Sequence, residues 1–488
     1  MRAGEFPPHV LREYALLADG ERGALVGPKG DVAWLCAPQW HSEAVFSSLI
    51  GGEGLYAVTP MDPWFVWGGY YESSSLVWHS RWVTSSGVVE CREALAFPGQ
   101  ANRLVMLRRI LAVDGPARVR VILHPRARFG RASLRDLHRE QGTWTARTGS
   151  LHVRWTGAEH AHRRRDGSLA CSIEVAEGGH HDLVLELSTR RLTGQPPGAP
   201  SLWSSTEAAW AEAVPPLEVP IATPDALHAY AVLRGMTSAG GGMVAAATTG
   251  LPERAEHGQN YDYRFAWVRD QCYVGQAIAA TGAHPLLDAA VNFVAGRLLE
   301  DGPKLKPAYT VDGGEVPDEG DLRHLPGYPG GEPKVGNRVN RQFQLDGLGE
   351  ALLLFGAAGR HGRLDHDHWD AVQVAAAAIE SRRGEPDAGV WELDDERWAH
   401  SGLTCAAGLR SVAGISGGRQ ASRWADLADT IVAEVSSHCV HPSGRWQRSP
   451  VDDRPDASLL LPAIRGAVPI DDPRSRATLA AVEFELSR

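Results

Sequence analysis

The strongest constraint on the fold is a change of hydrophobic period partway along the 488 residues. Before Pro200, apolar residues alternate in short segments separated by turn residues, as in 31–36, 75–83, 103–110, 118–123 and 182–187. From Thr223 onward they recur at helical spacing, over 224–236, 268–281, 285–300, 342–358, 367–382, 403–414, 419–437 and 474–487. Short strands without intervening helices predict a sandwich of antiparallel sheets, and the second half predicts a helical domain.

A chain of this length is expected to divide into two or three domains. We predict an N-terminal antiparallel β-sandwich over 1–203, a linker helix and connector over 204–222, and a helical domain over 223–488. Ser204–Glu207 offers a helix start, and Pro215-Pro216 ends it. Long loops rich in Gly, Pro and Asp interrupt the helical half, and loops of that length in a compact domain are usually functional.

The composition excludes several classes of function. The formal net charge of −10 argues against a nucleic-acid surface, which needs clustered Lys and Arg. The sequence shows neither a bilayer-spanning apolar run nor the apolar stretch of a signal peptide. The six cysteines are scattered without a C-x-x-C pair, as in reduced proteins, so we predict a cytoplasmic location. We expect no metal and no cofactor, and His366-Asp367-His368 is interpreted as a polar helix start.

The most informative local segment is Asn260–Asp270, which combines four aromatic side chains, two arginines and two aspartates at the start of a predicted helix. Carboxylates accept hydrogen bonds from sugar hydroxyls, guanidinium groups donate to them, and aromatic rings cover the apolar face of a sugar. The segment therefore indicates a carbohydrate site. The alternative is a helix N-terminus with a structural Arg–Asp pair.

A second candidate is Glu392, which follows Trp391 after a glycine-containing turn in Pro386–Glu392. A glutamate beside an indole ring can be partly desolvated and then retains its proton. Such a group can act as the general acid that protonates a glycosidic oxygen. The alternative is an ordinary exposed loop glutamate.

Several segments resemble glycoside hydrolase family 15 in the order and spacing of their motifs. They are Glu13–Gly20, Gly30–Pro38, Val244–Glu253, Tyr261–Asp270, His324–Tyr328, Val335–Asn337, Gln344–Asp346, Trp391-Glu392 with His400-Ser401, and Asp456–Pro462. The resemblance is to the bacterial branch of this family of glucoamylases, glucodextranases and trehalases, and it covers essentially the whole chain.

This resemblance implies a β-sandwich followed by an (α/α)6 toroid, and hydrolysis of terminal α-glucosidic bonds in trehalose or α-glucans with inversion. By position, Glu392 is the general acid. The resemblance also implies a set of substrate-binding residues, namely Tyr263, Trp267, Arg269, Asp270, Asn337, Gln344, Asp346 and Trp391.

An inverting hydrolase needs a second carboxylate about 6.5–9.5 Å from the acid to activate water. In the family this base lies in a segment well beyond the motif that Asp456–Pro462 matches, and we find no counterpart before Arg488. The sequence therefore predicts an incomplete toroid. Loop acids that could replace the base are Asp318, Glu319, Asp321, Asp452 and Asp453.

Two other functions stay open at this point. A non-catalytic glycan-binding relative would bind sugar without turnover, and a phosphate-dependent disaccharide phosphorylase would need no base because phosphate itself attacks. An open toroid would leave apolar helix faces uncovered, so we expect a homo-oligomer or a partner chain that covers them.

Overall fold

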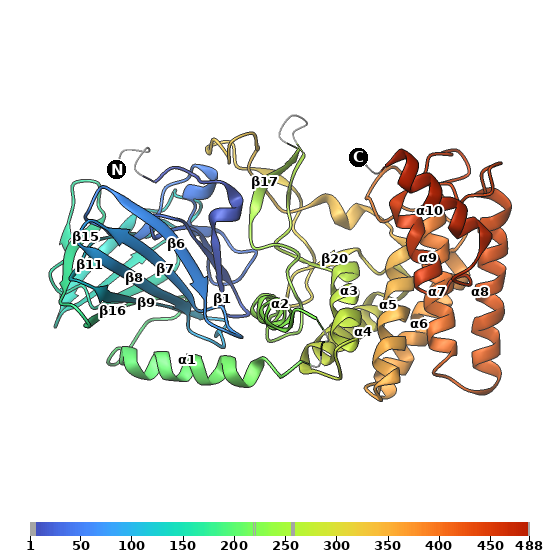
Figure 1. Ribbon diagram of the computed structural model, residues 1–488, viewed down its shortest axis with the longest axis horizontal. Coiled ribbons are helices and arrows are strands. Elements are labelled where there is room, and N and C mark those ends of the chain that lie inside the picture. The colour runs from blue at the N-terminus through green and yellow to red at the C-terminus, as the bar shows by residue number, and fades with distance from the viewer. Residues whose placement is uncertain (1–5, 218, 220, 255–258, 487–488) are drawn as a thin grey trace. The chain divides into compact units, whose positions relative to one another are not determined.

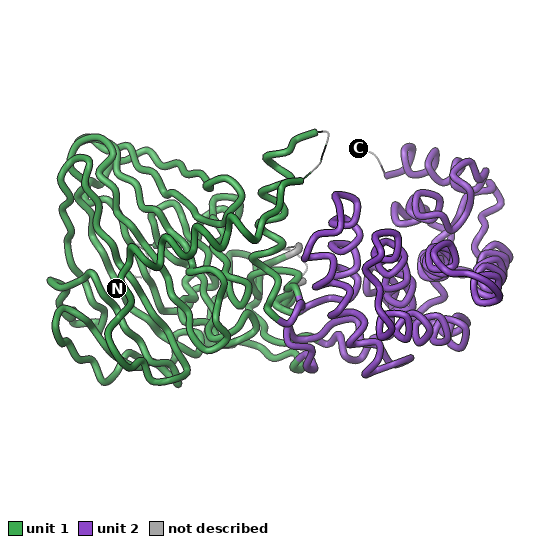
Figure 2. Tube along the Cα trace, turned by 90° about the horizontal axis from the view of Figure 1, so that it is seen from below, with its two compact units in different colours: residues 1–239, 243–265, 317–337 green, residues 240–242, 266–316, 338–488 purple. Residues whose placement is uncertain are grey.

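The computed structural model describes residues 6–217, 219, 221–254 and 259–486 (Figure 1). The chain forms two compact units, which Figure 2 shows in different colours. Unit 1 comprises Met1–Ala239, Met243–Phe265 and Pro317–Asn337, and unit 2 comprises Gly240–Gly242, Ala266–Val316 and Arg338–Arg488.

Unit 1 contains two eight-stranded antiparallel sheets. The first has the order β1-β2-β3-β5-β10-β15-β14, with β4 paired to β3, and the second has the order β11-β12-β13-β16-β9-β8-β7-β6. The strands are β1 (Ala15–Ala18), β2 (Gly23–Val26), β3 (Asp31–Cys36), β4 (Ala44–Phe46), β5 (Leu55–Pro60), β6 (Phe65–Tyr71), β7 (Trp78–Thr84), β8 (Gly87–Leu95), β9 (Arg103–Asp114), β10 (Ala117–His124), β11 (Leu134–Glu140), β12 (Thr143–Thr148), β13 (Leu151–Thr156), β14 (His162–Arg163), β15 (Leu169–Val175) and β16 (His180–Ser188).

The two sheets share one apolar core. In β10, Val119 and Val121 are buried while the alternate residues Arg118 and Arg120 are exposed, as expected for a strand with one face toward a core. Residues of both sheets, such as Val119 and Met106, belong to the same buried cluster. The predicted antiparallel sandwich is therefore confirmed.

A buried ion pair joins the neighbouring strands β8 and β9 in this core, and removal of one partner should be strongly destabilising. The Arg108 guanidinium pairs with Glu93 and donates to the backbone oxygens of Tyr56 (3.1 Å) and Gly30 (2.6 Å), and both charged side chains are almost fully buried. Glu93→Ala leaves the arginine charge buried without its counterion. We therefore expect a loss of about 3–5 kcal/mol in the free energy of unfolding of unit 1, measured by urea denaturation.

Glu174→Ala is the matched control, because Glu174 pairs with Arg118 on the surface of the same unit. Those two side chains are 63% and 58% exposed, so this substitution should cost less than about 1 kcal/mol. Equal losses in the two variants would show that burial of the Glu93 pair does not matter.

The other elements of unit 1 are the helices α1 (Ala199–Ala213) and α2 (Thr223–Met236) and the short strands β17 (Thr249–Arg254), β18 (Gln259–Asp262), β21 (Gly320–Asp321) and β22 (Lys334–Val335). Helix α1 begins at Ala199, earlier than the predicted start at Ser204. Pro200 lies in its first turn, where the missing N–H of proline costs nothing, so this proline opens the helix instead of preceding it.

The two units do not follow the predicted limits of the domains. Helix α2 and the segments 243–265 and 317–337 pack with the sandwich, although we assigned them to the helical domain 223–488. Residues 218 and 220 of the predicted connector lie outside the described residues. The limits 1–203, 204–222 and 223–488 remain a prediction about domain organisation along the chain.

Unit 2 is helical. Its described helices are α3 (Val268–Ala279), α4 (Pro285–Asp301), α5 (Leu345–Arg360), α6 (His366–Arg382), α7 (Ala399–Ala413), α8 (Gly418–His438), α9 (Leu461–Ile464) and α10 (Pro473–Glu485). Two short strands, β19 (Ala266–Trp267) and β20 (Ala308–Tyr309), pair with each other. Helix α5 packs against both α3 and α7, while α4, α6 and α8 each pack on the helix that precedes them. The result is an inner layer of α3, α5 and α7 and an outer layer of α4, α6 and α8.

Glycines allow the inner helices to approach closely. A Cβ at Gly349 of α5 would lie 2.7 Å from the backbone of Thr404 and Cys405 in α7, and a Cβ at Gly408 of α7 would lie 2.4 Å from the backbone oxygen of Gly349. Only glycine fits where two backbones are this close. The tight α5–α7 contact brings the N-terminal turns of these helices together at one end of the layer.

Among the described residues, none of the helices is both long enough and apolar enough to span a membrane.

Candidate active site

The core of the site is made by the first turns of α3 and α5. Arg269 lies in the first turn of α3, two residues after Trp267, and Gln344 and Asp346 lie at the start of α5. Because α3 and α5 pack side by side, Arg269 Nη1 donates to Gln344 Oε1 at 2.8 Å and lies 3.5 Å from Asp346 Oδ2. The packing thus joins two predicted substrate-binding segments that are far apart in the sequence.

Glu392 reaches the same arginine from the loop between α6 and α7. Its Oε1 accepts a hydrogen bond from Trp267 Nε1 at 2.9 Å and lies 3.4 Å from Arg269 Nη2. The side chain is 25% exposed, so the carboxyl is partly desolvated but accessible. Glu392 has φ +52°, a left-handed conformation that is uncommon for a residue with a side chain and often marks a functional site.

The carboxylates around Arg269 differ in burial and in the hydrogen bonds that they accept. Asp346 is fully buried, and among the described residues neither of its carboxylate oxygens accepts a hydrogen bond, although Arg269 lies within ion-pair distance. Burial raises the pKa of Asp270, and the Arg269 charge beside it opposes this effect. Buried oxygens without donors are expected where a ligand or ordered water supplies them.

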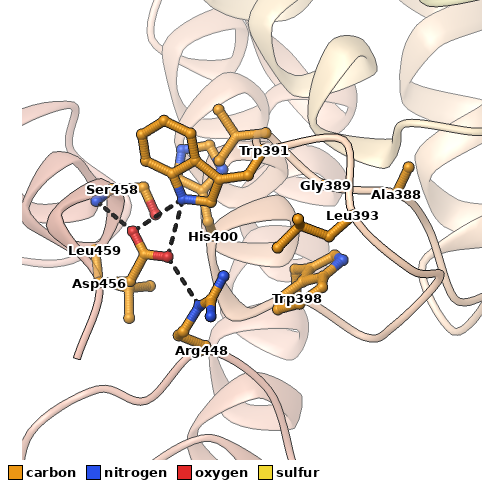
Figure 3. A pocket seen from close by; sticks show the side chains of 11 residues that line it. Ala388, Gly389, Trp391, Leu393, Trp398, His400, Arg448, Asp456, Ser458 and Leu459 are labelled. Carbon is orange, nitrogen blue, oxygen red and sulfur yellow. Dashed lines mark hydrogen bonds and ion pairs between the residues drawn. The ribbon is translucent and has the colours of Figure 1, made fainter. Parts of the chain in front are cut away.

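Trp391 is held in place by its indole N–H. The Nε1 atom donates to both oxygens of Asp456, at 3.1 and 2.9 Å, and Arg448 Nε donates to Asp456 Oδ2 at 3.1 Å (Figure 3). Although its edge is anchored, Trp391 is 55% exposed. A fixed and exposed indole offers a flat apolar surface on which a sugar ring can stack.

Two hollows of very different size border this loop. The pocket in Figure 3, between Trp391, Trp398 and Asp456, has a volume of about 10 Å³, which is room for a single water molecule. An open groove of about 590 Å³ begins at Glu392 itself and is lined by Leu393, Asp394, Glu396, Trp398, Arg448, Ser449, Val451, Asp452 and Arg454. Of these two hollows, the groove has the size of a ligand site.

The structure places seven of the nine predicted site residues in unit 2. They are Trp267, Arg269, Asp270, Gln344, Asp346, Trp391 and Glu392. Tyr263 and Asn337 belong to unit 1, where Asn337 Nδ2 donates to the backbone oxygen of Asp262 at 3.3 Å and the ring of Tyr263 packs edge-on against Tyr261.

Of the loop acids proposed as replacement bases, Asp452, Glu319 and Asp321 have basic partners. Asp452 lines the groove together with Glu392, but Arg448 (3.1 Å) and Arg454 (2.8 Å) pair with it. The hydrogen bond from Arg454 lowers the pKa of Asp452 to about 2, which makes this carboxylate a weak proton acceptor. Asp318, Glu319 and Asp321 belong to unit 1, and Glu319 lies 3.5 Å from Lys334.

A metal site is not assigned. Within the described part of the chain, His366, Asp367 and Asp370 are the one group close enough together to hold an ion, and all three are exposed. Acidic side chains in the first turn of a helix such as α6 interact favourably with its dipole without any metal. His368 forms a capping box with Asp365, as expected for the predicted polar helix start.

Sequence reasoning assigned no role to Asp456, Arg448 and Asp387, all of which contact the loop that carries Glu392. Asp456 lies in a segment that carried the family resemblance, and Asp387 lies in the Pro386–Glu392 segment that was singled out for Glu392, so these segments were the available signal. Arg448 lies in an ordinary polar loop, and the sequence around it offers no signal.

Comparison with known families finds two matches that together cover nearly the whole chain. The model for glycosyl hydrolases family 15 matches residues 228–488. The model described as trehalase-like, N-terminal matches residues 3–199.

Individual relatives agree with these matches. The trehalase of Mycobacterium tuberculosis is 27% identical, over 99% of this chain and 76% of that protein, and the trehalase of Mycolicibacterium smegmatis is 27% identical, over 99% and 78%. Trehalase 1 of Sulfolobus acidocaldarius is 31% identical over 52% of this chain and 46% of its own length.

Among solved structures, a bacterial glucoamylase complexed with acarbose superposes with a TM-score of 0.66 at 13% identity, covering 97% of this chain and 79% of that chain. At this level of identity the match shows the fold. It confirms the predicted class, antiparallel β-sheets followed by a helical domain of the (α/α)6 type.

Proposed function

Because the chain belongs to glycosyl hydrolase family 15, and is therefore a glycoside hydrolase, we propose that it hydrolyses terminal α-glucosidic bonds, with trehalose as its first candidate substrate and Glu392 as its general acid. Trehalose is placed before other α-glucosides because the two relatives that align over 99% of this chain are both trehalases. Maltooligosaccharides are the second candidate.

One observation carries the proposal: Arg269 links the candidate acid to the candidate sugar-binding residues. Its guanidinium group lies within 3.5 Å of Glu392, Gln344 and Asp346 at once. A sugar hydroxyl that binds to Asp346 or Gln344 would therefore be fixed relative to the carboxyl that has to reach the glycosidic oxygen. Such positioning accounts for much of the rate enhancement of enzymes.

The contacts of Glu392 indicate which oxygen carries the proton. Trp267 and Arg269 both approach Oε1 with N–H groups, so this oxygen has to act as an acceptor. The proton of the neutral acid then resides on Oε2. In the proposed reaction this O–H protonates the glycosidic oxygen, and the bond from that oxygen to the anomeric carbon breaks. Water adds to the anomeric carbon and releases a proton to the solvent, from which the neutral acid is restored.

The surroundings of Glu392 suit a sugar on either side of the bond to be cleaved. The exposed indole of Trp391 supplies an apolar surface for one ring. The groove of about 590 Å³ that starts at Glu392 has polar and charged walls, including Arg448 and Arg454, which can bind the hydroxyls of the leaving group. We propose that attack occurs with inversion, and we do not assign Asp452 as the base because its two arginines make it a weak one.

We place this activity in the cytoplasm. All six cysteines are buried and free, as is usual for proteins of a reducing compartment. Fractionation of the cells that produce the protein tests this location, and recovery with the secreted fraction would contradict it.

The function is tested by measuring glucose release from trehalose, maltose, isomaltose and a maltooligosaccharide mixture, with and without phosphate. We expect phosphate-independent release from trehalose. If attack occurs with inversion, nuclear magnetic resonance should detect α- and β-glucose in equal amounts as the first products, because the leaving glucose keeps its α configuration. Formation of α-glucose alone would contradict inversion and leave the hydrolysis intact.

The same assay separates the two other functions. Turnover that requires phosphate and yields a glucose phosphate would identify a phosphorylase. Binding of glucose or trehalose, detected by calorimetry on folded protein that releases no glucose, would identify a glycan-binding relative. Either result would overturn the proposed hydrolysis.

A further inference from the structure

The loop that carries Glu392 is closed at its base by a buried aspartate, Asp387. The Asp387 N–H donates to Glu396 O at 2.9 Å, and the Glu396 N–H donates back to Asp387 O at 3.0 Å. The same Asp387 oxygen accepts from Trp398 Nε1 at 2.8 Å. The backbone of Asp387 therefore ties the two ends of the segment 387–398 together, with Glu392 at its middle.

The carboxyl of Asp387 extends this anchoring to two helices. Its Oδ1 accepts from Gly389 N at 2.8 Å, from Ser401 Oγ at 3.0 Å and from Leu345 N at 3.4 Å. Gly389 lies in the loop, Ser401 in the first turn of α7, and Leu345 at the start of α5. A single oxygen thus connects the acid loop to both inner helices whose first turns border the site.

Such an anchor is needed because the loop adopts an uncommon conformation. Gly389 and Glu392 both have positive φ, +67° and +52°, and Glu392 has no glycine-like freedom to adopt it. A strained residue of this kind persists only when its surroundings hold it. The strained residue, Glu392, is the general acid of the proposed function.

We propose that Asp387 is a positioning residue, whose carboxyl fixes the loop that presents Trp391 and Glu392 to the substrate. This role rests on the proposed function of Glu392. It is distinct from catalysis itself, because Asp387 acts through the backbone of the loop, α5 and α7.

The carboxyl performs this role as the neutral acid. Asp387 is buried, and its Oδ2 has no hydrogen-bond partner among the residues that the structure describes. Burial raises the pKa of Asp387 to about 8, and the negative charge of Asp346 adds to the shift, while the hydrogen bonds to Oδ1 reduce it. Below pH 8 the group is therefore protonated, and above it a second negative charge appears beside Asp346.

Other charged groups surround Asp387 on every side. Asp346 approaches from α5, His400 belongs to the first turn of α7, and Arg397 and Glu396 belong to the loop itself. The adjoining cavity of about 510 Å³ is lined by Asp387 and, among charged or titratable groups, by Arg383, Glu385, Arg397, Glu434 and His438. Since Arg383 pairs with Glu434 at 3.2 Å, these two charges largely offset each other, and Asp346 is left as the decisive neighbour.

Asp387→Asn is the informative variant, because the amide keeps the Oδ1 acceptor and replaces the O–H by N–H. Asp387→Ala removes the anchor, and Asp395→Asn is the control, since Asp395 is an exposed aspartate of the same loop. We expect kcat of Asp387→Ala to fall about 10²-fold below pH 8 with little change in KM, as for a displaced acid. Asp387→Asn should retain most of kcat.

The pH profile separates positioning from a merely structural role. The ratio of kcat between Asp387→Asn and the wild type should rise about tenfold per pH unit above pH 8, because only the wild type ionises at position 387, and the ratio between Asp395→Asn and the wild type should not change with pH. An alkaline limb that is the same in Asp387→Asn and in the wild type would overturn the proposal.

Two measurements that do not depend on turnover test the role of Asp387 independently of the proposed hydrolysis. Because the folded-state pKa is raised, the stabilisation from the bound proton is lost as the pH rises from the ordinary value of 3.8 to about 8. The urea midpoint of Asp387→Asn minus that of the wild type should therefore increase across this pH range. Above the range the difference should stay constant. Hydrogen exchange of the 387–398 amides should accelerate in Asp387→Ala but not in Asp395→Asn.

If the wild type releases no glucose while both of these results are obtained, the proposed hydrolysis fails and Asp387 remains the anchor of the loop. A constant difference in urea midpoint, together with unchanged exchange in Asp387→Ala, would refute the anchor itself, whatever the activity.

Discussion

Glu392→Gln is expected to lower kcat on trehalose about 10³-fold, because glutamine cannot donate a proton to the glycosidic oxygen at the moment the bond breaks. The amide has the size of the carboxyl, and its oxygen can still accept from Trp267 Nε1 and Arg269. The geometry of the site should therefore survive. KM, or the affinity for trehalose by calorimetry, should change less than about threefold because the substitution removes an interaction of the transition state only.

A substrate with a good leaving group provides the control for this prediction. The 4-nitrophenolate of an aryl α-glucoside leaves without protonation, so Glu392→Gln should retain far more activity on this substrate than on trehalose. The exposed Asp395→Asn removes a carboxylate from the same loop without touching the acid and should behave like the wild type on both. Equal losses of Glu392→Gln on the two substrates would indicate a structural role for Glu392.

The sequence was sufficient to predict the β-sandwich and the helical domain, but it was not sufficient to predict how their elements pack. Alternation in 118–121 follows from one buried strand face, and helical spacing in 285–300 from one buried helix face, so both are visible in the sequence. The start of α7 shows where this fails. The helix begins at Ala399, and the predicted start at 403 was wrong because His400 and Ser401 are polar yet buried. Their burial depends on contacts such as Ser401 with Asp387.

The assignment of segments 243–265 and 317–337 to the helical domain shows the same limitation. These segments lie between helices in the sequence, yet they pack with the sandwich. The buried Arg264 explains part of this, because it donates to Ser42 O at 2.7 Å and pairs with Asp262, which accepts from Gly336 N at 3.0 Å. A buried arginine that joins three distant segments leaves no periodic signal.

For the site, the residue types were predictable and the connections between them were not. Arg269 and Glu392 each lie in a motif that the sequence singles out, but 123 positions separate them. Their contact depends on where the α6–α7 loop folds back onto α3. Asp387 is the clearest case, since a loop aspartate is usually exposed, and only its contacts with α5 and α7 reveal it as buried.

Arg269→Met is expected to have the second largest effect, because it removes the cation that Glu392 and Asp346 share. Asp346 is fully buried, and loss of its counterion should reduce the free energy of unfolding by about 3–5 kcal/mol, measured by urea denaturation. The value of kcat/KM for trehalose should fall about 10³-fold, since truncation of one partner in a buried charge pair costs about 2–5 kcal/mol of binding as well. Both losses should be seen in the same preparation of protein.

The double variant Arg269→Met with Asp346→Asn separates the two losses. With both charges removed, no uncompensated carboxylate is buried, so most of the lost stability should return, to within about 1–2 kcal/mol of the wild type. The activity should not return, because Glu392 and the sugar hydroxyls still lack the guanidinium group that connects them. A double variant that regains kcat/KM along with stability would mean that Arg269 serves only to neutralise Asp346, and the central observation behind the proposed function would lose its force.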